Sequence, residues 1–209
     1  MMRYNLHIWI WMKLNRLYLS TVHRIILLIY LTGLCVSCSQ WRMQKDIEHL
    51  CKGAIHMPAD LEIIQNGIVP DSCMQSFPER ITLIMYFSSD KCTLCNVTRL
   101  ANYEKIFDLR KSGQFFPMVI FAPKNQEYKA LVADLKLQPQ PYPIYIDKND
   151  TFRQLNTNLP KDSRYHTFLL DKNNHVVLVG NPLSSDAMWT LFKSTLDNMI
   201  AHDGVYVPE

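Results

Sequence analysis

One stretch, Ile81 to Arg99, constrains the fold and the chemistry of this chain more than any other. Its sequence is ITLIMYFSSDKCTLCNVTR, an uncharged apolar run followed by a short polar turn and a Cys-Thr-Leu-Cys motif. An apolar run of this length is typical of a strand covered on both faces, and the later apolar positions recur at helical spacing. The stretch therefore predicts a central strand, a turn and a helix whose first turn carries Cys92 and Cys95.

Those two cysteines would lie where a thiolate forms most easily. A helix N-terminus has partial positive charge and unpaired N–H groups, which lower the pKa of a thiol below its free value of about 8.5. Sulfurs at this spacing can also close a disulfide of about 2.05 Å. We predict a redox-active dithiol. A structural disulfide and half of a zinc site are the alternatives, although zinc needs further ligands and there is no second CxxC or HxxxH.

The rest of the pattern alternates strands with helices. The sequence predicts strands at 61–64, 81–87, 117–122, 142–146, 166–170 and 175–179, and helices at 93–112, 126–137, 149–155 and 185–202. Alternation of this kind implies parallel strands, and the last two strands form an antiparallel hairpin across the turn Asp171–Asn174. We expect an α/β fold, in which a central mixed sheet is flanked by helices.

The N-terminus has the parts of an export signal. Basic residues precede the run IILLIYLTGLCVSC, which begins at Ile25, closes on Cys38 and is shorter than the roughly 20 residues of a comfortable membrane span. It resembles a bacterial lipoprotein signal, in which Cys38 becomes the lipid-bearing first residue. Met12, which opens MKLNR, is an alternative start. An uncleaved anchor and a core helix are the other interpretations.

The element order, with a CxxC at a strand-to-helix junction, resembles the thioredoxin-like family, specifically the anchored extracytoplasmic proteins of the TlpA and ResA type. The resemblance rests on ITLIMYFSSDKCTLC, YPIYIDKNDTFRQL and YHTFLLDKNNHVVLVGNP. It implies three regions: a signal peptide at 1–37, a tether at 38–55 and a thioredoxin-like domain at 56–209.

The same resemblance implies an envelope-anchored thiol-disulfide oxidoreductase facing the periplasm. Cys92 would be the attacking nucleophile and Cys95 the resolving thiol, with no cofactor and no metal. The partners would be cysteine-containing envelope proteins or a redox partner protein, together with the membrane that holds the anchor. The alternative is a redox-silent lipoprotein of the same fold that acts as a partner-binding module.

Across from the dithiol, the family places a cis-proline just before the hairpin strand. Alignment of that hairpin with Thr167–Asp171 puts Tyr165 or His166 at this position. Both are therefore candidates for the neighbourhood of the site. We expect the peptide bond here to be trans, because a cis bond before a residue other than proline costs about 2.5–4 kcal/mol.

Cys51 and Cys73 are the remaining cysteines of the exported part, and in an oxidising compartment we expect a structural disulfide between them. A peroxidatic cysteine is disfavoured, because Met85 stands where the P-x-x-x-T/S-x-x-C pattern of peroxiredoxins requires proline. The formal net charge of +3 is small, and part of it comes from the N-terminal segment. Nothing in this balance indicates a nucleic-acid partner.

Overall fold

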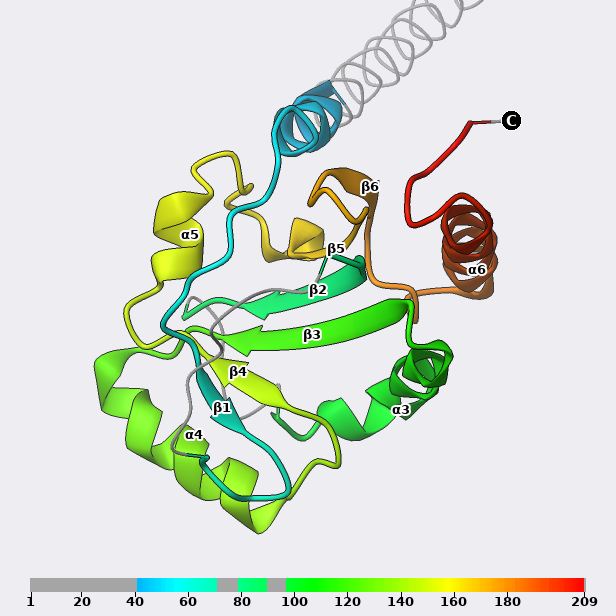
Figure 1. Ribbon diagram of the computed structural model, residues 1–209. Helices are drawn as coiled ribbons and strands as arrows, with labels where there is room; N and C mark the ends of the chain where they lie inside the picture. Colours follow the sequence, from blue (N-terminus) through cyan, green and yellow to red (C-terminus); the bar gives the residue numbers. More distant parts are fainter. Residues whose placement is uncertain (1–40, 71–78, 90–96, 209) are drawn as a thin grey trace, which may run out of the picture. The chain divides into compact units, whose positions relative to one another are not determined.

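The structure is a computed structural model that describes residues 41–70, 79–89 and 97–208, without the side chains of 111 and 112. Residues from Ile47 onward form one compact unit, and residues 41–50 are helical. In that described part, no helix is both long and apolar enough to cross a bilayer. The strands and helices in Figure 1 are β1 Glu62–Ile64, β2 Ile81–Phe87, α3 Glu104–Phe107, β3 Phe115–Phe121, α4 Asn125–Leu137, β4 Ile144–Ile146, α5 Thr151–Leu155, β5 Thr167–Leu170, β6 Val176–Val179 and α6 Asp186–Ala201.

The six strands form one mixed sheet in the order β1-β4-β3-β2-β5-β6. The strand that precedes the CxxC motif, β2, lies inside the sheet, parallel to β3 on one side and antiparallel to β5 on the other. The pair β3-β4 is parallel, whereas β1-β4 and β5-β6 are antiparallel. A parallel core closed by an antiparallel hairpin next to the central strand is the thioredoxin-like arrangement, so the predicted fold class is confirmed.

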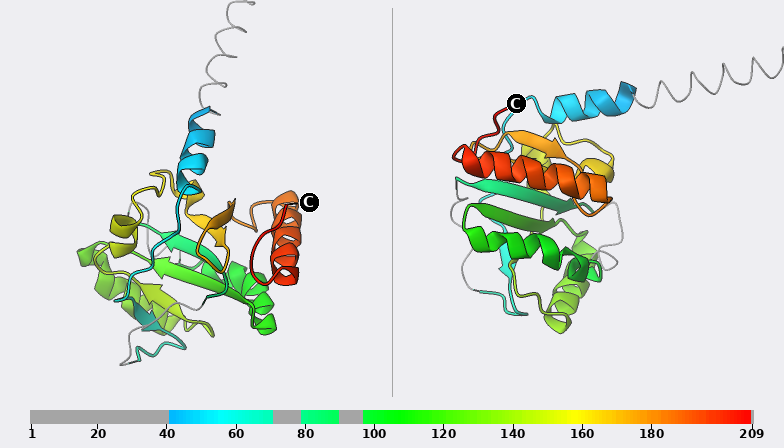
Figure 2. Two further views of the ribbon diagram at one scale, coloured as in Figure 1. Left: turned by 45° about the horizontal axis from the view of Figure 1, so that its top comes forward. Right: turned by 90° about the vertical axis from the view of Figure 1, so that its right-hand side faces the viewer.

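Two hydrophobic cores lie on opposite faces of the sheet. Along β2, Leu83 and Met85 contribute to the core that also holds side chains of α3, α4 and α6. The alternate residues Ile84 and Tyr86 contribute to the core that contains Phe152 of α5. The right-hand view of Figure 2 shows α6, in red, lying alongside the strands and running in roughly the same direction as they do. Burial on both faces explains why β2 and β3 lack charged residues.

The strand β3 begins at Phe115, two residues before the predicted start at Pro117. Proline has no amide hydrogen and is rarely tolerated inside a sheet. Here β4 pairs with β3 only from Val119 to Phe121, beyond the proline, so the missing amide removes no hydrogen bond to β4. The paired length of β4, which sequence alone does not reveal, is what allows the longer strand.

The helix predicted up to Gly113 is irregular. From Leu100 it consists of the 3₁₀ turn Leu100–Tyr103, the short helix α3 and a second 3₁₀ turn at Asp108–Ser112. The Tyr142 hydroxyl donates a hydrogen bond to the Leu100 carbonyl at 2.9 Å. This bond attaches the start of the segment to the loop before β4. The left-handed Gly113, with φ of 76°, ends the segment as predicted.

Part of the segment predicted as a tether packs with the domain. Leu50 and Ile55 are buried in the core on the α5 side. Nearby, buried Asn156 at the end of α5 bonds both ways to His56: it accepts from the His56 amide at 2.8 Å and donates to the His56 carbonyl at 2.7 Å. Asn158 donates to the Leu50 carbonyl at 3.1 Å. These bonds attach the segment before β1 to α5.

Replacing Asn156 by alanine should lower the free energy of unfolding by about 2–3 kcal/mol. The change leaves the His56 amide and carbonyl without their partner, and an unsatisfied group costs about 1–3 kcal/mol when buried. Urea unfolding followed by tryptophan fluorescence measures the effect. Asn158→Ala is the matched control, since it removes a single, partly exposed hydrogen bond and should cost about 1 kcal/mol or less. Equal losses in the two variants would contradict this account.

Candidate functional site

The candidate site lies at the carboxyl end of β2. The strand ends at Phe87 and is followed by the buried Ser88. Cys92 and Cys95 fall in 90–96, outside the described residues, and the described chain resumes at the buried Val97. What can be described is therefore the set of side chains around the carboxyl end of β2.

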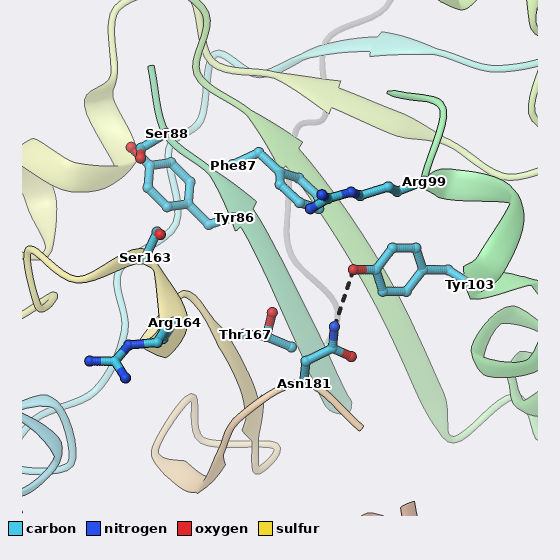
Figure 3. A pocket seen from close by; sticks show the side chains of 9 residues that line it. All are labelled: Tyr86, Phe87, Ser88, Arg99, Tyr103, Ser163, Arg164, Thr167 and Asn181. Carbon is cyan, nitrogen blue, oxygen red and sulfur yellow. Dashed lines mark hydrogen bonds between the residues drawn. The ribbon is translucent and has the colours of Figure 1, made fainter. Parts of the chain in front are cut away.

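These side chains enclose a cavity of about 280 Å³. It is bounded by the end of β2, the segment after the dithiol, the start of β5 and the loop after β6 (Figure 3). Its described lining consists of Tyr86, Phe87, Ser88, Arg99, Tyr103, Ser163, Arg164, Thr167 and Asn181. The wall is thus rich in hydroxyl groups and contains two arginines.

Tyr86 holds the end of β2 in place. Its hydroxyl donates a short hydrogen bond to Asp150, the residue that precedes α5. Arg153 lies 3.6 Å from the same carboxylate. Burial is the larger cause, and the hydrogen bond to Asp150 the second, of a pKa of Tyr86 above its usual range. The phenol is therefore protonated at neutral pH and well above it. This interaction links the strand before the dithiol to the inserted β4-α5 unit.

The two near-site candidates, Tyr165 and His166, are both buried. The His166 carbonyl accepts from the Tyr86 amide at 2.9 Å, which continues the β2-β5 pairing by one residue. Its ring lies 5.2 Å from the Tyr86 ring, and Nε2 is 2.8 Å from the Pro160 carbonyl oxygen. Among the described residues, the neighbouring Thr167 lines the cavity, whereas Tyr165 and His166 do not. All described peptide bonds, including those at 165 and 166, are trans.

Arg99, Tyr103 and Asn181 were not predicted as site residues. Asn181 Nδ2 donates to the Tyr103 hydroxyl at 3.3 Å across the cavity, as the dashed line in Figure 3 shows. Burial raises the pKa of Tyr103, against the opposing effects of the Asn181 bond and the Arg99 charge. The spacing of four from Cys95 to Arg99 and on to Tyr103 is a helical signal that could have indicated two of them. Asn181, in a loop after β6, carries no such signal.

The other predicted cysteines are placed only in part. Cys51 is exposed, just after the helical residues 41–50. Its predicted partner Cys73 and the predicted lipid attachment site Cys38 lie outside the described residues. The disulfide between Cys51 and Cys73 and the lipid at Cys38 therefore stay predictions.

No protein-family model matches the sequence, and no curated protein matches it. Among solved structures, an uncharacterised thioredoxin-like protein from Porphyromonas gingivalis is 14% identical, with a TM-score of 0.46, and the match covers 72% of this chain and 95% of that one. The thioredoxin domain of a thiol-disulfide oxidoreductase from Bacteroides vulgatus is 15% identical (TM-score 0.45), with 69% of this chain and 98% of that chain covered. AhpC from Enterococcus faecalis is 14% identical (TM-score 0.45), with 77% and 99% covered. At these identities, what those proteins catalyse is not transferred to this chain.

The raised pKa values of Tyr86 and Tyr103 predict a loss of stability at alkaline pH. A tyrosine in the unfolded chain ionises near pH 10, whereas both of these ionise at higher pH in the folded state. Their contribution is therefore complete below about pH 10 and is lost as the pH rises from there toward the folded values. Urea unfolding at about pH 8 and about pH 11 should show this decline.

Tyr103→Phe should make that decline smaller, because one raised pKa is removed. Tyr206→Phe, at an exposed position near the C-terminus, is the control and should leave the decline unchanged. The same alkaline loss in the wild type and in Tyr103→Phe would contradict the assignment.

Proposed function

We propose that this chain is an envelope-anchored thiol-disulfide oxidoreductase that acts through Cys92 and Cys95. One observation carries the proposal: in the sequence both cysteines follow β2, the inner strand of a thioredoxin-like sheet, and the carboxyl end of this strand borders a cavity lined by polar side chains. A dithiol in this place can meet a substrate from outside while the strand behind it is fixed by β3 and β5.

In the reaction proposed, the Cys92 thiolate attacks one sulfur of a disulfide in a partner protein. A mixed disulfide forms, and the other partner sulfur leaves as a thiolate that takes up a proton. The Cys95 thiolate then attacks the Cys92 sulfur, which closes the Cys92–Cys95 disulfide and releases the partner as a dithiol. Two electrons pass from this chain to the partner, and the reverse sequence oxidises a partner dithiol.

Replacement of either cysteine separates the two steps. Cys92→Ser should slow reduction of a model disulfide by at least about a hundredfold, since the attacking thiolate is gone. Cys95→Ser should instead accumulate the mixed disulfide, which a non-reducing gel detects after thiol alkylation. The double variant Cys51→Ser/Cys73→Ser is the control, and it should keep both the rate and the trapped species.

The alternative, a redox-silent partner-binding module, is favoured by the peptide before β5. It contains no proline, and the His166 ring turns to Tyr86 and Pro160 instead of lining the cavity. A redox titration with alkylation decides between the two functions. A dithiol that equilibrates with glutathione supports the oxidoreductase. A pair that stays oxidised to a potential well below about −300 mV supports the binding module.

Anchoring through a lipid on Cys38 forms the second part of the proposal. Its support is the basic region, the short apolar run and the small residues before this cysteine. Cys38→Ala should abolish incorporation of labelled fatty acid in a bacterial host, whereas the control Cys35→Ala should keep it. Fatty-acid labelling that survives Cys38→Ala would rule out this site. Membrane association without any label in the wild type would indicate an uncleaved anchor.

A further inference from the structure

The cavity at the carboxyl end of β2 presents hydrogen-bond donors with a fixed orientation. Asn181 Oδ1 accepts from the Leu183 amide at 2.9 Å, so its Nδ2 group faces the Tyr103 hydroxyl. The phenolic oxygen is then the acceptor of that bond, and its own proton remains to be donated elsewhere. A tyrosine keeps its phenolic proton at neutral pH, and burial raises the pKa of Tyr103 further above its usual value. Tyr103 therefore offers an O–H donor to a ligand in the cavity.

The charge of the cavity wall is positive. Its described lining includes Arg99 and Arg164 but neither Asp nor Glu. Arg164 is already compensated, since its guanidinium lies 2.7 Å from Asp162 and points away from Tyr103 in Figure 3. Arg99 is exposed and forms no ion pair with any of the described residues. A guanidinium is always charged at physiological pH and matches the geometry of a carboxylate.

Aliphatic hydroxyl groups also line the cavity, those of Ser88, Ser163 and Thr167. The Ser88 Oγ is buried and has no hydrogen-bond partner within the described part of the chain. Thr167, at the start of β5, lines the opposite side. A buried hydroxyl without a partner is uncommon in folded proteins. Apart from Arg164, the polar lining thus combines the guanidinium of Arg99 and the phenol of Tyr103 with aliphatic hydroxyls.

We propose that this cavity binds a carboxylate of the substrate, with Arg99 and Tyr103 as the specificity-determining residues. The inference rests on the proposed function for one point only, that the carboxylate lies next to the substrate's reacting disulfide. The preferred substrate is then a disulfide whose cysteine is followed or preceded closely by an acidic group. An acidic side chain of a polypeptide and the free carboxylates of glutathione share this chemistry.

The test uses two short peptide disulfides that differ only in Glu or Gln next to the cysteine, together with the detergent-solubilised full chain. The wild type should reduce the Glu peptide about fivefold faster than the Gln peptide at low salt, as expected for a partly exposed ion pair. Added salt should shrink this ratio. Arg99→Gln should bring this ratio to about one, and Tyr103→Phe should lower it in part.

Arg110→Gln is the matched control, since Arg110 is exposed on the same segment but outside this cavity. It carries the same charge change and should keep the preference. A Glu-to-Gln ratio of about one in the wild type, or an unchanged ratio in Arg99→Gln, would overturn the proposal. Slower reduction of both peptides by the same factor in Arg99→Gln would also overturn it, because that pattern indicates a general effect on the dithiol.

A binding measurement separates this proposal from the redox activity. Fluorescein-labelled peptides with Ser in place of Cys should bind the wild type with the same Glu preference, measured by anisotropy, and Arg99→Gln should remove it. If reduction fails for both peptides but this preference persists, the oxidoreductase is wrong and the carboxylate site stands. If reduction proceeds without any preference in rate or binding, the carboxylate site is wrong and the oxidoreductase stands.

A last comparison assigns the source of the carboxylate. Glutathione disulfide and its ethyl ester are tested in the same assay. A rate that depends on Arg99 for the Glu peptide alone assigns the cavity to acidic polypeptides. Dependence on Arg99 for glutathione disulfide but not its ester assigns it to the small thiol. Either result supports a carboxylate site, whereas no dependence on Arg99 for any of these substrates overturns it.

Discussion

The fixed position of β2 is the constraint on which the rest of the structure depends. This strand pairs along its whole length with β3 and over four residues with β5, and both of its faces are buried. Its side chains divide the hydrophobic residues into two cores, one on each side of the sheet. Because the peptide that carries the predicted dithiol continues from this strand, its starting point is determined by hydrogen bonds in both directions.

Hydrophobic periodicity was sufficient to predict this framework. The limits of β2, the end of the helical segment at Gly113 and the start of α6 after Ser185 agree with the sequence pattern, since each depends on local residue types. The breaks in the helix after Leu100 and the early start of β3 did not follow from the pattern. Both involve distant parts of the chain: the Tyr142 hydroxyl bonds to the Leu100 carbonyl, and β4 pairs with β3 only beyond Pro117.

The candidate site was also predictable only where it depends on local sequence. Cys92 and Cys95 were predicted from their spacing and from the preceding strand, whereas the cavity wall was not. Arg99 and Asn181 are far apart in the chain. Both line the same cavity because β6 pairs with β5 and its following loop lies at this end of the sheet. The side-chain direction of His166 was equally hidden, since its ring packs on Tyr86 through a contact across two strands. Tertiary geometry, and not residue type, decides which polar groups line the cavity at the end of β2.

The bonds between α5 and the segment before β1 have a mechanical consequence. A pull on the chain from its N-terminal side first meets Asn158 at Leu50, then the bridge between Ile55 and Asn174, and then Asn156 at His56. These attachments lie in series along the segment and would yield one after another before tension reached β1. A force applied to the chain before Leu50 would therefore have to break these attachments before it reached the sheet.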